Sequence, residues 1–108
     1  MTTHKEKNKL NMLLISGAYQ DMEVYDDKNM EILNEHYREY AAIIGVLYKK
    51  HPNVFGNLYN HQLREIKDNK MSIKKSFSEI SRQENFTAYK HSIKEAVEVT
   101  VDYINDYI

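Results

Sequence analysis

Histidine and carboxylate side chains are the residues of this chain whose spacing comes nearest to chemistry. His61 and Glu65 stand four residues apart, as do His91 and Glu95, so each pair would share one face of a helix. Two such pairs on facing helices could hold a metal ion. Carboxylate-bridged di-metal bundles use a Glu-x-x-His step instead, which this sequence lacks. Because pairing across a helix surface is the commoner role of such residues, we expect no metal ion and no cofactor.

The spacings that nucleophilic catalysis requires are also missing. None of the serines lies in a Gly-x-Ser-x-Gly elbow, and the three glycines are isolated, so no loop of the phosphate-cradling kind is predicted. The lack of cysteine removes thiolate catalysis, disulfides and cysteine-based zinc sites together. We therefore expect a protein that is not an enzyme and has no evident small-molecule substrate.

Composition limits the partners and the compartment. The formal net charge of the 108 residues is −1, so no overall field would attract nucleic acid or an anionic membrane. Twelve of the fifteen basic residues are lysine, which argues mildly against base recognition by arginine. No apolar run approaches the roughly 18 residues of a membrane span. We expect a cytoplasmic protein, and the abundance of Lys, Asn, Ile and Tyr points weakly to a low-GC bacterium or a mobile element.

The elements that would position any site are helices, and the clearest of them is the stretch from Met30 to Leu47. Its apolar residues recur with spacings of three and four, which places them on one face of a helix. They are Met30, Leu33, Tyr37, Tyr40, Ile44 and Leu47. Asp26 or Asp27 would cap this helix, and Pro52 would end it.

A helix before it, from about Lys9 to Val24, is predicted to carry two apolar faces. One consists of Leu10, Leu13, Leu14, Gly17 and Ala18, and the other of Met12, Ile15, Tyr19 and Met22. A helix that is apolar on both sides either lies at the centre of its bundle or contacts something beyond its own chain. The second set is therefore our candidate protein interface, with a central position as the alternative.

The second half of the chain predicts one or two further helices. Apolar residues from Phe55 to Ile80 stay in one helical phase, after Asn53 as a plausible N-cap. A continuous helix of about 28 residues is favoured over a break at residues 68–70. A turn near Gln83–Asn85, with Asn85 as the cap, would start the last helix. The sequence thus predicts an all-α protein, an elongated antiparallel bundle of three to four helices in a single domain, 1–108, with residues 1–8 frayed.

Charged residues are segregated on these predicted helices. Glu31, Glu35 and Glu39 form an acidic stripe, whereas Arg64, Lys67, Lys74 and Lys75 form a basic stripe on the third segment. Solvated helix faces are the ordinary explanation of such stripes. Like charges four residues apart nevertheless cost a helix a few tenths of a kcal/mol, which leaves room for a charged partner or a neighbouring subunit.

Taken together, these features favour a small cytoplasmic helical protein that binds and modulates another protein, with a homodimer expected. A nucleic-acid-binding regulator that uses the basic stripe is the alternative. In size and helix layout the chain resembles bacteriocin immunity proteins and small helical proteins of phages and mobile elements. That resemblance is one of shape, and it implies an immunity, inhibitory or regulatory role.

Overall fold

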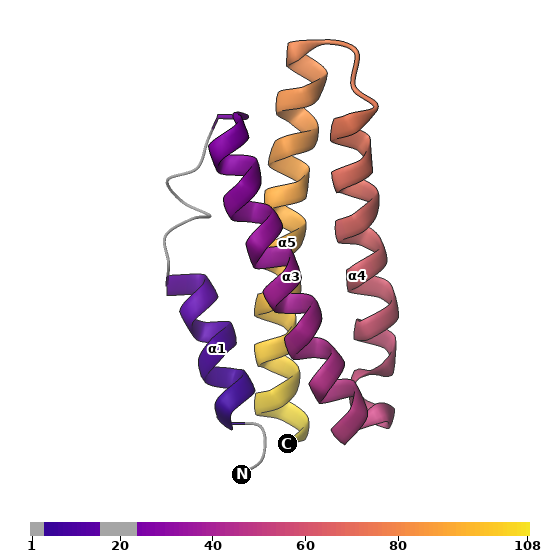
Figure 1. Ribbon diagram of the computed structural model, residues 1–108. Coiled ribbons are helices and arrows are strands. Elements are labelled where there is room, and N and C mark those ends of the chain that lie inside the picture. The colour runs from indigo at the N-terminus through magenta and orange to yellow at the C-terminus, as the bar shows by residue number, and fades with distance from the viewer. Residues whose placement is uncertain (1–3, 16–23) are drawn as a thin grey trace.

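The chain folds into a bundle of α-helices. A computed structural model describes residues 4–15 and 24–108, and this part of the chain forms four helices and no strand (Figure 1). The helices are α1 (His4–Ile15), α3 (Asp27–Lys50), α4 (Pro52–Lys74) and α5 (Glu79–Tyr107). The predicted all-α class is confirmed, and the choice between three and four helices is settled as four for the described residues.

The bundle is elongated and antiparallel. Helices α1 and α4 run in one direction, while α3 and α5 run in the other (Figure 1). The molecule measures 46 × 24 × 18 Å, and its radius of gyration of 14.2 Å exceeds the ~13 Å expected for a compact chain of this length. Helix α5, which contacts each of the other three, sets the long dimension: its 29 residues correspond to about 43 Å.

Local sequence explains where α3 begins and ends. Asp26 caps it as predicted, because its carboxylate accepts a 2.7 Å hydrogen bond from the backbone N–H of Asn29. The helix stops at Lys50, before Pro52. Helix α4 then starts at Pro52 itself, with His51 in the N-cap position, so the predicted cap Asn53 is wrong. Proline suits the first turn of a helix because backbone N–H groups in that turn have no acceptor within the helix, so its lack of an N–H loses no hydrogen bond.

Helix α4 is continuous through residues 68–70, as favoured, but it is shorter than predicted. It ends at Lys74, and Ser78 caps α5 by accepting a 3.1 Å hydrogen bond from the N–H of Ser81. The predicted turn near Gln83–Asn85 is therefore wrong. Asn85 lies inside α5, and its side-chain amide donates to the Ser76 hydroxyl at 2.8 Å, which fastens α5 to the end of α4.

The N-terminal helix also differs from its prediction. Helix α1 begins at His4 rather than Lys9, so the expected fraying of residues 1–8 is wrong from His4 onward. The reason is Glu6, which is buried in the bundle and forms a 2.6 Å ion pair with Lys50 of α3. The described part of this helix ends at Ile15.

The core lies where all four helices meet. The buried apolar side chains are Leu10, Leu13, Leu33, Tyr40, Ile43, Ile44, Leu47, Phe55, Leu58, Ile66, Ile73, Phe86, Tyr89, Ile93, Ala96, Val97 and Ile104. Four of the six residues of the predicted α3 face belong to this core, and Met30 and Tyr37 pack against it. Helix α1 covers a second side of α3, which is why His36 and Ile43 are buried as well. No described helix is long and apolar enough to cross a bilayer.

Candidate protein-interaction surface

A groove runs between α1 and α3 on the outside of the bundle. Two adjoining hollows of about 490 and 230 Å³ share Lys9, Ala42 and Ile43 among their lining residues, and together they form what we call the α1–α3 groove. The other residues that line it are Lys5, Glu6, Met12, Leu13, His36, Glu39, Val46 and Lys50.

The α1 wall is fixed to the bundle by three buried side chains. Leu10 and Leu13 enter the core, three residues apart on the inner face of the helix. Glu6, one turn earlier, is the polar anchor through its ion pair with Lys50. Burial alone would raise the pKa of Glu6, but the hydrogen bond from Lys50 and the charges of Lys50 and Lys9 hold this pKa below its ordinary value of 4.5. The carboxylate is therefore charged at neutral pH, and α1 is held in register against α3.

The floor of the larger hollow is apolar apart from one imidazole. Leu13 and Ile43 are buried there beside His36, whose side chain belongs to α3. Burial lowers the pKa of His36, and the nearby carboxylates of Glu39 and Glu35 only partly oppose this effect. The imidazole is therefore neutral at physiological pH and behaves as part of the apolar floor.

The rim of the groove exposes apolar surface to solvent. Met12 on α1 is 70% exposed, and Val46 on α3 is 43% exposed, with the small residue Ala42 beside it. Ile15 is 80% exposed on the same helix as Met12 but does not line the groove. Apolar side chains that gather beside a groove, rather than lying scattered, are typical of contact surfaces.

The structure describes two of the four predicted interface residues, and the interface itself stays a prediction. Met12 and Ile15 point away from the core, so a central position of the first helix is wrong for its described residues. Tyr19 and Met22, the other two predicted interface residues, lie outside the described residues. The α3 side of the groove was not predicted. Its signal was Ala42 and Val46, which are four residues apart and outside the main apolar face of that helix.

The predicted acidic stripe lies along one side of this surface. Glu31, Glu35 and Glu39 are all exposed on α3, and Glu39 lines the groove. The N-terminal half of α1 contributes exposed Lys5 and Lys9 toward the opposite end. This surface of α1 and α3 thus carries lysines toward one end, apolar side chains in the middle and glutamates toward the other end, of which Glu39 lines the groove.

The predicted basic stripe lies elsewhere, on α4. Arg64, Lys67 and Lys74 are exposed on this helix, and Lys75 is exposed directly after it. Sequence reasoning missed two cations beside them, Lys70 and Arg38. The Lys70 ammonium lies 5.7 Å from the centre of the Tyr37 ring, across the α3–α4 contact, and its pKa is lowered by burial and by the charges of Lys74 and Arg38. Like charges from two helices therefore gather at this seam.

The histidine–carboxylate pairs remain on their own helices. His61 and Glu65 are 3.6 Å apart and His91 and Glu95 are 3.5 Å apart, each pair on one exposed helix face. Within residues 4–15 and 24–108, no three His, Asp or Glu side chains are grouped so that they could hold a metal ion. These pairs act as surface i,i+4 contacts.

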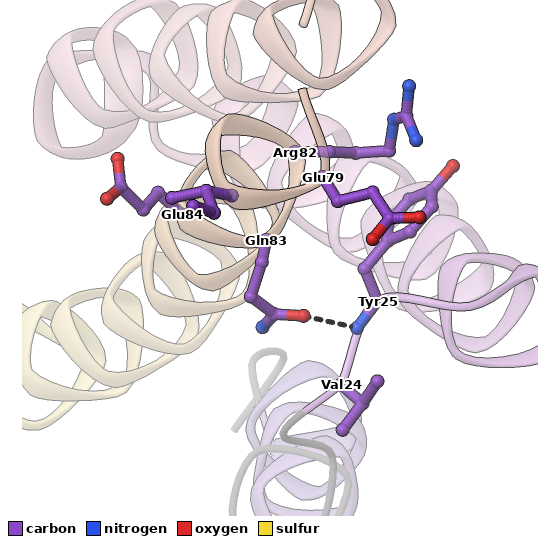
Figure 2. A pocket seen from close by; sticks show the side chains of 7 residues that line it. Val24, Tyr25, Glu79, Arg82, Gln83 and Glu84 are labelled. Carbon is purple, nitrogen blue, oxygen red and sulfur yellow. Dashed lines mark hydrogen bonds between the residues drawn. The ribbon is translucent and has the colours of Figure 1, made fainter. Parts of the chain in front are cut away.

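A separate hollow, of about 590 Å³, lies where α5 begins (Figure 2). Its lining side chains are Val24, Tyr25, Glu79, Ile80, Arg82, Gln83 and Glu84. The backbone N–H of Tyr25 donates a 2.7 Å hydrogen bond to the Gln83 side chain, and the Arg82 guanidinium lies 5.7 Å from the centre of the Tyr25 ring. These contacts fasten the chain before α3 to α5. Because Val24 directly follows residues that the structure does not describe, we assign this hollow no ligand.

Comparisons with known proteins give no family for this chain. No protein-family model matches it, and no similar protein was found among curated proteins or among solved structures. A functional interpretation therefore has to come from the surfaces described above.

Proposed function

We propose that this protein is a non-enzymatic interaction module that binds and modulates another protein through the α1–α3 groove. The observation that carries the proposal is the exposed apolar rim, with Met12 on one wall and Val46 on the other, above a buried apolar floor. Exposing such side chains costs solvation free energy, which a partner's apolar side chain would recover. An immunity, inhibitory or regulatory role falls within this proposal.

Site-specific photocrosslinking tests it. A photoreactive phenylalanine analogue would replace Met12 in the groove and, as a matched control, His61 on the exposed face of α4. In extracts of the native host we expect an adduct with one different protein, identified by mass spectrometry, from position 12 and not from position 61. Purified, that partner should bind the wild-type chain and should bind a Met12→Lys variant at least about tenfold more weakly.

The outcome that would contradict the proposal is a lack of adducts, or the same adducts from both positions. Circular dichroism of Met12→Lys controls for folding. Because Met12 is 70% exposed, we expect its helical signal to be unchanged.

A nucleic-acid-binding regulator is the second candidate, and a specific observation favours it. Lys70, Lys74 and Arg38 form a cluster of cations, in which burial and then the charges of Lys74 and Arg38 lower the pKa of Lys70. Such a cluster gains free energy when it meets phosphate groups. The predicted binding is weak and falls steeply as salt is raised, and Lys67→Glu/Lys74→Glu should abolish it. If DNA and RNA of mixed sequence show no anisotropy change at low salt, this candidate is rejected.

A further inference from the structure

We infer that, while the partner is absent, a second copy of this chain occupies the α1–α3 groove, in an antiparallel, two-fold symmetric dimer. Dimer formation through this groove presupposes the contact surface proposed above. It adds the identity of an occupant, and it follows from the order of charges along the groove rather than from its apolar rim alone.

The charges are ordered along the long axis of the bundle. Because α1 and α3 are antiparallel, Lys5 lies toward the end of the groove where α3 finishes, next to Val46 and Lys50. Met12 lies toward the middle, with Ala42 and Glu39. Glu35 and Glu31 continue along α3 in the other direction. The surface is thus basic at one end of the groove and acidic toward the other, where Glu39 lines the groove and Glu35 and Glu31 lie exposed beyond it on α3.

The two charged ends are about equally far from the apolar middle. Lys5 precedes Met12 by seven residues, and Glu35 precedes Ala42 by seven residues, so each charge lies about 10 Å from the middle of the groove, in opposite directions. A two-fold axis that lies in the plane of contact and crosses the groove at its middle therefore places the basic end of each copy against the acidic end of the other. A surface that is complementary to itself in this way is what an isologous dimer requires.

The apolar middle would be covered by the same arrangement. Because this axis keeps α1 of one copy over α1 of the other, the two Met12 side chains would meet near the axis, with Ala42 of each copy beside them. Methionine adapts to irregular surfaces, and the small side chain of Ala42 leaves room for it. The acidic residues also acquire a reason to be clustered, because the charges of Lys5 and Lys9 of the second copy would offset their mutual repulsion.

The inference is tested by light scattering after size exclusion, combined with charge reversal. The wild-type chain should appear at about 26 kDa, twice the 12.9 kDa of one chain, and should dissociate on dilution. Glu35→Lys/Glu39→Lys makes both ends basic, and Lys5→Glu/Lys9→Glu makes both acidic. Each variant alone should dimerise at least about tenfold more weakly than the wild type, because like charges then face each other at both ends.

Mixing these two variants is the decisive step. In a mixed pair every basic end meets an acidic end again, so we expect a heterodimer with an affinity close to that of the wild type. Arg64→Glu/Lys67→Glu, a matched reversal on the exposed face of α4, should dimerise as the wild type does. Since Lys9 lies near the buried Glu6, circular dichroism must show that the α1 variant is folded; the α3 variant changes only exposed residues and tests the inference without touching α1.

A wild-type chain that stays at 12.9 kDa at every concentration overturns the inference. So does a dimer whose affinity is unchanged in Glu35→Lys/Glu39→Lys, and so does a mixture of the two variants that forms no heterodimer. The crosslinking experiment separates this failure from that of the proposed function. A monomer that still gives a specific adduct with a different protein from position 12 retains the contact surface and loses only the second copy.

Discussion

The hydroxyl groups of Tyr40 and Thr100 form a hydrogen bond of 2.8 Å inside the core, where both residues are fully buried. Thr100 donates its own proton to the carbonyl of Ala96 at 2.7 Å, so the Tyr40 hydroxyl must be the donor to Thr100. Thr100→Val would leave that donor buried without an acceptor, whereas Tyr40→Phe removes the donor itself. We therefore expect Thr100→Val to cost about 1–3 kcal/mol of unfolding free energy, and Tyr40→Phe about 1 kcal/mol. Urea titrations of the two variants check this order, and equal costs would contradict it.

The same residue makes stability fall in strong base. Burial raises the pKa of Tyr40 from 10.0 to about 12. Because the folded-state pKa lies above the unfolded one, the stabilisation is complete below pH 10 and is lost as the pH rises through about 12. Tyr40→Phe should reduce the slope of the unfolding free energy over that interval, measured by urea titration at several pH values. Tyr89 and Tyr37, whose pKa values are also raised by burial, account for the slope that remains. Tyr107→Phe, at a tyrosine that is 63% exposed, is the matched control and should leave the slope unchanged.

The ion pair of Glu6 and Lys50 is asymmetric in burial, which predicts asymmetric mutational costs. The side chain of Glu6 is 6% exposed and that of Lys50 is 38% exposed. Lys50→Met leaves a buried carboxylate without its cation, while Glu6→Gln leaves an ammonium that still reaches water. We expect Lys50→Met to cost about 2–3 kcal/mol and Glu6→Gln about 1 kcal/mol by thermal unfolding at pH 7.

The pH dependence of this ion pair has a defined sign. The pKa of Glu6 is lowered in the folded state, so its contribution is present above about pH 4.5 and is lost as the pH falls through the folded-state value. Glu6→Gln should remove that part of the acid sensitivity. A variant that keeps the full wild-type dependence below pH 4.5 would show that the ion pair does not anchor α1.

At the scale of the elements, the exposure of Phe77 and Ile80 shows where helical periodicity alone predicts a helix end wrongly. Both residues are in phase with the apolar face of α4, so periodicity assigned them to the core, yet they are fully exposed and 76% exposed. The helix had already ended at Lys74, because Ser78 caps the next one. We predict that Phe77→Ala costs less than about 0.5 kcal/mol, and Ile73→Ala, one turn earlier and buried, about 2–5 kcal/mol. Chemical denaturation distinguishes the two, and a large loss for Phe77→Ala would restore the longer helix.

Helix existence was predictable because each helix has a continuous apolar period, as in the face of α3 from Leu33 to Leu47. Boundaries were less predictable, because capping depends on single side chains. Ser78 is a standard N-cap residue followed by Glu79, which suits the positive end of a helix, but the apolar phase outweighed that signal. Of the residues that line the α1–α3 groove, the sequence predicts only Met12 as an interface residue. The α3 wall is not predictable in this way, because it depends on how α1 packs against α3. Only a long-range contact such as that of Glu6 with Lys50 fixes this arrangement.

For the molecule as a whole, stability should be lowest in α1. This helix has 12 residues and buries two apolar side chains, Leu10 and Leu13, whereas α5 has 29 residues and contacts every other helix. Amide protons of α1 are therefore expected to exchange through a local opening of smaller free energy than the global unfolding that limits exchange in α5. Hydrogen exchange followed by mass spectrometry on proteolytic fragments measures both rates. Equal protection of α1 and α5 in a monomer would contradict this order.

The occupied groove adds a concentration dependence to this opening. If a second copy binds across α1 and α3, α1 cannot open without breaking the dimer. The free energy of its opening should therefore rise by RT ln(1 + c/Kd) as the protein is concentrated, where c is the concentration of free monomer and Kd is the dissociation constant of the dimer. The protection of α5 should change less, because its amides are buried in either state. Glu35→Lys/Glu39→Lys, which leaves α1 intact, should return its exchange to the dilute value at every concentration. If the protection of α1 changes neither with protein concentration nor in this variant, α1 opens as it does in a monomer. The groove would then be free for a different protein.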